Sequence, residues 1–254
     1  MTIDLFTQKC GYEINGMWMP RVTAITSIIP KPNLERFLNS YANPFAAQRA
    51  LEQSADWGNL VHGAVEGLLV EKPFVIDARI SPSVDAFRQW LKDNSMRLVN
   101  KAQSIERRVF DMENCYAGTI DVVAKLGGKI GVLDIKTGSG IWREHALQTA
   151  AYLNAYNKNA PKTQKGTTRW ILRIDQYEEC MGCFAKRRLK EGAPRVRGGN
   201  RFCNHQWGVA KAEIEFKELP DFREDIEAFL AAKELWEWHH RDALKQIGNY
   251  PKKK

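Results

Sequence analysis

Two adjacent glycines, Gly127 and Gly128, separate two segments rich in the β-branched and aliphatic residues that strands prefer, residues 116–126 and 129–136. Glycine tolerates the positive φ angles that a two-residue hairpin turn requires at both central positions. The sequence therefore predicts an antiparallel hairpin in which the residues that directly flank the glycines face each other. This turn fixes the pairing of every other residue in the two strands.

The predicted pairing places Asp121 and Asp134 directly opposite each other on one face of the hairpin. Lys136 lies on the same face, because side chains alternate along a strand. Opposed carboxylates repel, and a cation between them removes the repulsion; such oxygen ligands suit Mg²⁺ or Mn²⁺. A nearby lysine can stabilise charge on an attacked phosphodiester. The alternatives are a solvated face that Lys136 neutralises, or a one-residue slip that separates the aspartates.

The spacing of apolar residues predicts the other elements. Residues 33–71 are predicted to be mostly helical, with an interruption at Pro44, a helix over 46–53 and another that begins at Asp56. Further helices are predicted at 82–98, 141–157 and 221–244, strands at 104–112, 167–175 and within 207–216, and a short hairpin at 12–18.

No linker divides the chain, so the sequence predicts a single α/β domain over residues 1–254. Its expected parts are a helical N-terminal part at about 33–100, a catalytic core at about 104–176, a basic loop at about 180–205 and a C-terminal helix at about 221–245.

Composition and cysteine usage narrow the class of protein. Apolar residues make up 44% and charged residues 27%, which excludes disordered, collagen-like and membrane-spanning classes. The start of the chain lacks the basic and apolar regions of a secretory signal. Five cysteines are an odd number for a disulfide framework. We therefore expect a cytoplasmic protein with no membrane partner.

Positive charge is concentrated in one part of the chain. The formal net charge is +8, and residues 158–201 alone hold twelve basic and four acidic side chains, which accounts for the whole excess. Such a local excess indicates an anion-binding face, most simply for nucleic-acid phosphates, and the alternative is a solvated loop. The candidate nucleic-acid contacts are Lys186, Arg187, Arg188, Lys190, Arg195, Arg197 and Arg201.

Four short motifs follow one another along about residues 55–155: Gly58-x-x-x-His62, Gly118-Thr-Ile-Asp121, Asp134-Ile-Lys136-Thr-Gly138 and Gln148-x-x-x-Tyr152. In this order they resemble the PD-(D/E)XK nuclease superfamily. More narrowly, they are similar to its RecB-like branch, which includes CRISPR-adaptation nucleases and a mitochondrial genome-maintenance exonuclease. The resemblance implies a restriction-endonuclease-like α/β fold, with a central mixed β-sheet flanked by helices and an N-terminal helical layer.

The resemblance also implies a catalytic centre on the hairpin. Asp121 and Asp134 would hold the catalytic metal, with the carbonyl of Ile135 as a further ligand. Lys136 would orient or activate the attacking water.

Four further residues would complete this centre by the same resemblance. His62 would add a metal contact from the helical layer, and Glu106 matches a variable acidic position. Gln148 and Tyr152 would approach the site or the nucleic acid, and their spacing independently places them on one helical face. The alternatives are a packed or capping His62, a Glu106 paired with a neighbouring arginine, and a Tyr152 that belongs to the core.

The cysteines offer a second candidate metal site. Cys180 and Cys183 have metal-ligand spacing, and Cys203 and His205 follow, so these four residues could bind zinc. Some members of the RecB-like branch hold an iron–sulfur cluster on four cysteines. Cys10, Cys180, Cys183 and Cys203 occur in a similar order along this chain. The final gap is longer than in that branch, and one CxxC is a weak signal, so free cysteines are favoured over zinc or a cluster.

These observations predict a Mg²⁺- or Mn²⁺-dependent DNA nuclease with a role in repair or recombination. By analogy with the branch, we expect an exonuclease that acts on single strands or duplex ends. The sequence has no GxxxxGK[ST] motif, so the protein would act alone or receive DNA from a helicase or recombination partner. The alternatives are a nucleic-acid-binding module without turnover and a structure-selective or RNA-directed nuclease.

Overall fold

The predicted hairpin lies at the centre of the fold. The computed structural model describes residues 2–251, and in it β5 (Tyr116–Leu126) and β6 (Lys129–Lys136) pair antiparallel from the turn to Val122. Gly127 and Gly128 have φ angles of +56° and +80°, as the turn requires. The predicted turn and register are therefore confirmed over this part of the hairpin.

The hairpin is part of an eight-stranded mixed sheet. β6 runs parallel to β7, and all other pairs in the sheet are antiparallel. The remaining strands of this sheet are β3 (Arg97–Leu98), β4 (Ile105–Asp111), β7 (Thr168–Glu179), β8 (Lys186–Arg188), β9 (Arg195–Arg197) and β10 (Lys211–Leu219). β1 (Gly11–Ile14) and β2 (Met17–Pro20) form a separate hairpin.

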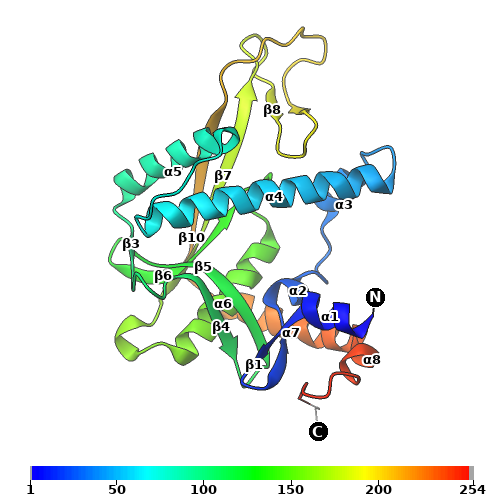
Figure 1. Cartoon of the computed structure of the whole chain (residues 1–254), viewed down its shortest axis with the longest axis vertical. Coiled ribbons are helices and arrows are strands. Elements are labelled where there is room, and N and C mark those ends of the chain that lie inside the picture. Colours follow the sequence, from blue (N-terminus) through cyan, green and yellow to red (C-terminus); the bar gives the residue numbers. More distant parts are fainter. Residues whose placement is uncertain (1, 252–254) are drawn as a thin grey trace.

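Helices cover both faces of the sheet (Figure 1). They are α1 (Ile3–Cys10), α2 (Val22–Thr26), α3 (Pro32–Leu38), α4 (Pro44–Leu69), α5 (Ser81–Asn94), α6 (Arg143–Asn159), α7 (Arg223–His239) and α8 (Arg241–Leu244), with 3₁₀ turns at Ala78–Ile80 and Lys162–Gln164. This mixed sheet with flanking helices confirms the predicted fold class. Among the described residues, no helix has both the length and the apolarity that a membrane span needs.

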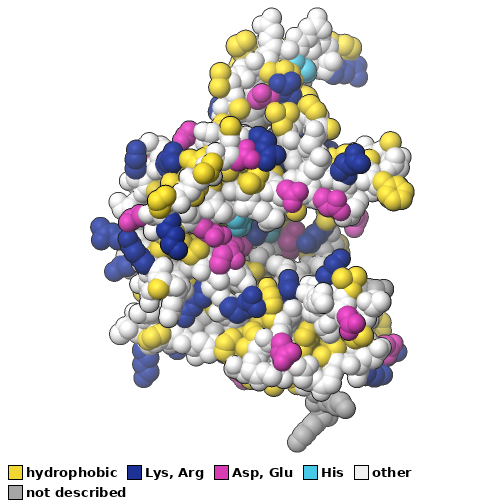
Figure 2. Space-filling view, viewed as in Figure 1, with side chains coloured by type: hydrophobic (Ala, Val, Ile, Leu, Met, Phe, Trp, Pro, Cys, Tyr) yellow, Lys and Arg dark blue, Asp and Glu magenta, His cyan; other side chains and the backbone are white. Residues whose placement is uncertain are grey.

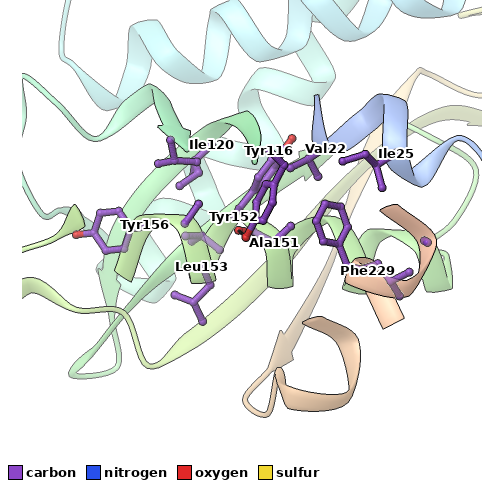
Figure 3. Close-up of a cluster of buried hydrophobic side chains, with 14 of the residues drawn as sticks. Val22, Ile25, Tyr116, Ile120, Ala151, Tyr152, Leu153, Tyr156 and Phe229 are labelled. Carbon is purple, nitrogen blue, oxygen red and sulfur yellow. Dashed lines mark hydrogen bonds between the residues drawn. The ribbon is translucent and has the colours of Figure 1, made fainter. Parts of the chain in front are cut away.

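Two hydrophobic cores lie on opposite sides of the sheet. One joins β5 to α2, α6 and α7, and Figure 3 shows Tyr116, Tyr152 and Phe229 packed together within it. The other joins the sheet to α4 and α5, for example through Val65, Phe87 and Leu133, all of which are almost fully buried. The two cores hold α4 and α6 on either side of the central hairpin.

The structure corrects two sequence-based boundaries. The helix predicted over residues 82–98 ends at Asn94, where Ser95 has a φ angle of +49°, and Arg97–Leu98 form β3.

α4 is a single helix of 26 residues, where we predicted two helices, and Asp56 lies inside it. Asn43 caps this helix by accepting a hydrogen bond from the backbone N–H of Ala46 at 2.9 Å, and Pro44 occupies its first turn. The residues around Asp56 include neither proline nor a glycine pair, so nothing stops the helix there, and polar residues are tolerated on its solvent side.

Candidate active site

The strand pairing is interrupted at Asp121. β5 pairs with β4 on both sides of this residue and with β6 from the turn as far as Val122, the residue that follows it, but within the described strands Asp121 itself has no ladder partner. Continuing the two registers places Asp121 opposite Glu106 on β4 and opposite Asp134 on β6. Oδ2 of Asp121 accepts a hydrogen bond from the backbone N–H of Ile135 at 2.6 Å. The carboxylate thus takes the place of a backbone acceptor where the sheet opens.

His62 and Glu106 gather around Asp121. His62 extends from α4, and its Nδ1 lies 3.8 Å from Oδ1 of Asp121. One ligand atom from each of the three residues lies within 4.8 Å of the other two. One imidazole nitrogen and several carboxylate oxygens form a donor set that suits a divalent cation. Figure 2 shows acidic and histidine side chains together at the hollow below α4.

Asp134 lies on the other side of Asp121 and has its own partners. Its side chain is 2% exposed, and Nζ of Lys136 lies 2.6 Å from its Oδ2. Nε2 of Gln148 donates hydrogen bonds to Oδ1 of Asp134 at 3.2 Å and to the hydroxyl of Tyr152 at 3.0 Å. The structure therefore brings the seven predicted catalytic residues to one place, from five elements: β4, β5, β6, α4 and α6.

The electrostatics of the site reflect crowded carboxylates. Partial desolvation, followed by the charges of Asp121 and Glu66, raises the pKa of Glu106 to about 7. Burial lowers the pKa of Lys136, but the neighbouring Asp134 and Asp121 more than offset this and raise it overall. Lys136 therefore remains an ammonium ion at neutral pH. The carboxylates exceed this single positive charge, which is the condition under which a divalent cation is stabilised.

One residue of the site was missed by sequence reasoning. His145 lies on the same face of α6 as Gln148, and its Nδ1 accepts a hydrogen bond from the backbone N–H of Trp142 at 3.1 Å. Burial, together with the charge of Lys136, lowers the pKa of His145 to about 4, so its ring is neutral. The spacing of His145, three residues before Gln148, was the signal that could have identified it.

Four of the candidate nucleic-acid contacts are held by the fold. Lys186, Arg187 and Arg188 form ion pairs with acidic residues of β7 and β10 at 2.5–3.0 Å. Lys190 is 8% exposed and donates a hydrogen bond to the carbonyl of Thr137 at 2.5 Å. This bond joins the basic loop at about residues 180–205, which we call the basic segment, to Thr137, the residue that follows Lys136.

The other three candidate contacts are arranged differently. Arg197 and Arg201 are exposed, and the guanidinium of Arg195 lies 4.4 Å from the centre of the Phe37 ring. Among the described residues, these three arginines have no ion-pair partner. Their positive charge is therefore available to an anionic ligand.

A cleft lies beside two of these arginines and beside the loop that follows Lys136. Its volume is about 370 Å³, and it lies between α3, α4 and the basic segment. Arg195 and Arg197 line one side of it, and Gly138, two residues after Lys136, lines another. A phosphate backbone that followed this cleft would pass from positive charge toward the carboxylates.

The second candidate metal site also comes together. One ligand atom from each of Cys180, Cys183, Cys203 and His205 lies within 4.8 Å of the others. Cys10 is not part of this group, because it ends α1 and packs beside the core of α6 and α7. The sequence order that included Cys10 therefore does not correspond to a spatial cluster.

The chain was compared with known proteins. The family model described as the PD-(D/E)XK nuclease superfamily matches residues 34–243. This range includes the hairpin, the residues around Asp121 and the basic segment. A search of curated proteins finds no match.

Proposed function

The chain belongs to the PD-(D/E)XK nuclease superfamily and is on that ground a metal-dependent nuclease, and we propose that it is a Mg²⁺- or Mn²⁺-dependent deoxyribonuclease of the RecB-like branch. We further propose that it acts as an exonuclease on single strands or duplex ends. The observation that carries the proposal is that Glu106, Asp121 and Asp134 come from three adjacent strands, with Glu106 close to Asp121 and Lys136 paired with Asp134.

The residues present fit a divalent cation. Asp121, Asp134 and the carbonyl of Ile135 would hold it, with His62 and Glu106 completing the donor set. The pKa of Glu106 is raised first by desolvation and then by the neighbouring carboxylates Asp121 and Glu66, and a cation would relieve that second contribution. When bound, the cation would act as a Lewis acid that stabilises charge on the phosphate oxygens.

The chain's own residues would perform the remaining tasks in hydrolysis. Water attacks phosphorus, the bond to the leaving oxygen breaks, and the products are one phosphate end and one hydroxyl end. Lys136, held as an ammonium ion, would orient the attacking water and stabilise the developing negative charge. Gln148 would fix the orientation of Asp134 through its hydrogen bond.

The basic segment and the cleft would bind the nucleic acid. Arg195 and Arg197 line the cleft and Arg201 lies on the same segment, and their positive charge suits contacts to phosphates without regard to base sequence. The preference for DNA ends rests on the resemblance to the RecB-like branch, as does the proposal that a helicase or recombination protein supplies the DNA.

The decisive experiment is a cleavage assay on linear DNA labelled at either the 5′ or the 3′ end. Single-stranded and duplex forms are compared in Mg²⁺, Mn²⁺ and EDTA, together with flap and RNA substrates. We expect metal-dependent loss of label from one end, abolished in Lys136→Ala and Asp121→Asn. Lys129→Ala is the matched control, because Lys129 is a lysine of the same strand that pairs with Glu218 away from the site.

Each alternative has its own outcome in this assay. DNA that is retained in a gel shift but remains uncut in every metal would indicate a binding module. Cleavage confined to the flap or the RNA would indicate a structure-selective or RNA-directed nuclease.

A further inference from the structure

Four potential metal ligands lie at the two ends of the segment that connects β7 to β10. Cys180 and Cys183 directly follow β7, and Cys203 and His205 precede β10. Figure 1 shows this segment, with β8, extending beyond α4 and α5 at the upper end of the molecule. Its location separates it from the catalytic carboxylates, which lie at the central hairpin.

Backbone hydrogen bonds bring the two ends of the segment together. The N–H of Met181 donates to the carbonyl of Gln206 at 2.8 Å, and the N–H of Gly208 donates to the carbonyl of Glu179 at 2.9 Å. Cys180 and Trp207 form an isolated antiparallel bridge between these bonds. The four ligands are thus placed by backbone pairing rather than by loop position alone.

The distances between ligand atoms match tetrahedral coordination. Sγ of Cys180 lies 3.8 Å from Sγ of Cys203, and Sγ of Cys183 lies 3.3 Å from Nδ1 of His205. With Zn–S bonds of about 2.3 Å and Zn–N bonds of about 2.0 Å, tetrahedral geometry separates two sulfurs by about 3.8 Å and a sulfur from a nitrogen by about 3.5 Å. A disulfide would instead require an S–S distance of about 2.05 Å.

Two neighbouring residues pack against the ligand group. The ring of His205 packs against Trp207 with their centres 4.7 Å apart, which fixes the orientation of the imidazole. Gly199 approaches so closely that a β carbon there would lie 2.7 Å from Sγ of Cys183.

The segment contributes little to the hydrophobic cores of the described residues. None of the hydrophobic clusters among the described residues includes a residue between 180 and 210. Its large apolar side chains point to solvent: Met181 is 66% exposed, Phe184 is 72% exposed and Phe202 is 78% exposed. A small unit that buries little apolar surface is commonly held by a metal or a disulfide.

We propose that Cys180, Cys183, Cys203 and His205 bind one structural zinc ion. Four protein ligands close the coordination sphere and leave no position for water or substrate, so the ion has a structural role. An iron–sulfur cluster on four cysteines is not supported, because the fourth ligand is a histidine and Cys10 lies elsewhere.

The zinc ion would hold the ends of the segment that carries Arg195, Arg197 and Arg201. This consequence rests on the proposed nuclease function, whereas the metal site itself does not. Loss of the ion would free the segment and raise the KM for DNA, and would leave kcat largely unchanged because the carboxylates are on separate strands.

Metal content tests the proposal directly. Wild-type protein, Cys183→Ser, His205→Asn and the control Cys10→Ser are expressed with added zinc, passed through gel filtration under reducing conditions and analysed for zinc and iron. We expect about one zinc per chain in the wild type and in Cys10→Ser, and at least a tenfold loss in the other two. Replacement by Co²⁺ should give the visible absorption of a tetrahedral thiolate site.

Variant folding is checked independently. Circular dichroism reports the core, and limited proteolysis of wild-type protein before and after zinc chelation reports the segment. We expect new cleavage within residues 180–205 after chelation, reversed by added zinc. Wild-type protein without zinc, equal zinc in all variants, stoichiometric iron with sulfide, or a Cys180–Cys203 disulfide under these reducing conditions would each overturn the proposal. Nuclease activity without bound zinc would overturn only this inference, and bound zinc without nuclease activity would overturn only the proposed function.

Discussion

Gly118 on β5 lies directly against Tyr152 on α6: a β carbon at position 118 would be 2.4 Å from Cε1 of the tyrosine ring. Figure 3 shows Tyr152 within the core between these elements. One turn before it, Gln148 donates hydrogen bonds to both Tyr152 and Asp134. The glycine of one sequence motif therefore makes room for the tyrosine of another, and the tyrosine is connected to the carboxylate of Asp134 through Gln148.

The first prediction tests this contact. Gly118→Ala should lower the free energy of unfolding by about 1–3 kcal/mol, because the tyrosine ring must move to relieve the overlap. The movement should also lower kcat, since Gln148 would lose its position beside Asp134. Urea unfolding and a cleavage assay measure the two effects. In combination with Tyr152→Ala the cost should be smaller than the sum of the single changes, and simple additivity would contradict the contact.

The second prediction compares two glycines of α4. A β carbon at Gly58 would lie 3.3 Å from Oγ1 of Thr137, whereas one at Gly63 would meet nothing within 4 Å. Gly63→Ala should therefore raise stability by about 0.5–1 kcal/mol through helix propensity and leave cleavage unchanged. Gly58→Leu should lower both stability and cleavage, because it pushes α4, and with it His62, away from the hairpin. Equal behaviour of the two sites in thermal unfolding would refute this interpretation.

The sequence predicted the features that depend on neighbouring residues. The turn at Gly127 and Gly128 determines the register by itself, so the pairing of β5 with β6 as far as Val122 and Leu133 followed from counting residues. The break in α4 was wrongly predicted. Asp56 is a residue type that often caps a helix, and only tertiary packing shows that it lies inside one. The hydrogen bond from Ile135 to Asp121 could not be foreseen, since it exists only where the ladder opens.

Contacts between distant segments were the hardest to predict. The bond between Lys190 and Thr137 joins the loop after β8 to the loop after β6, which no local pattern connects. The ligand group at Cys180 depends on the antiparallel pairing of β7 with β10, which determines whether Cys203 and His205 return to the same place. Spacing alone predicted the ligand types, and only the sheet topology shows that they meet.

The third prediction concerns pH. The pKa of Glu106 is raised to about 7 from its ordinary value of 4.5, so in the absence of metal the folded protein holds this proton longer than the unfolded chain. This group therefore lowers stability as pH rises from about 4.5 to about 7. Metal binding requires the ionised carboxylate, so Mg²⁺ affinity should rise with pH up to about 7 and then level off. Titration calorimetry between pH 5.5 and 8.5 measures it, and Glu106→Gln should flatten this part of the profile.

The fourth prediction concerns Lys136. Lys136→Met leaves the buried carboxylate of Asp134 without its ammonium partner, which should lower the stability of the metal-free protein by up to about 3–5 kcal/mol. Added Mg²⁺ should restore more stability to this variant than to the wild type, because the cation replaces the lost charge. Cleavage should fall by about 10²–10⁴-fold. Lys129→Ala removes an exposed ion pair and should lower the free energy of unfolding by at most about 1 kcal/mol. Added Mg²⁺ should stabilise this control variant and the wild type equally.

The fifth prediction concerns the exposed arginines of the basic segment. Arg197→Ala and Arg201→Ala should each weaken binding of single-stranded DNA by a similar factor for every sequence, because phosphate contacts carry no base information. Each lost contact should reduce the slope of log affinity against log salt by about 0.7. Fluorescence anisotropy in EDTA, at several salt concentrations, measures this slope without cleavage. Lys162→Ala and Lys165→Ala are the matched controls, since both lysines are exposed but lie before the start of β7, at the opposite end of that strand from the basic segment. Equal slopes for the arginine variants and these controls would show that the nucleic acid follows another path across the protein.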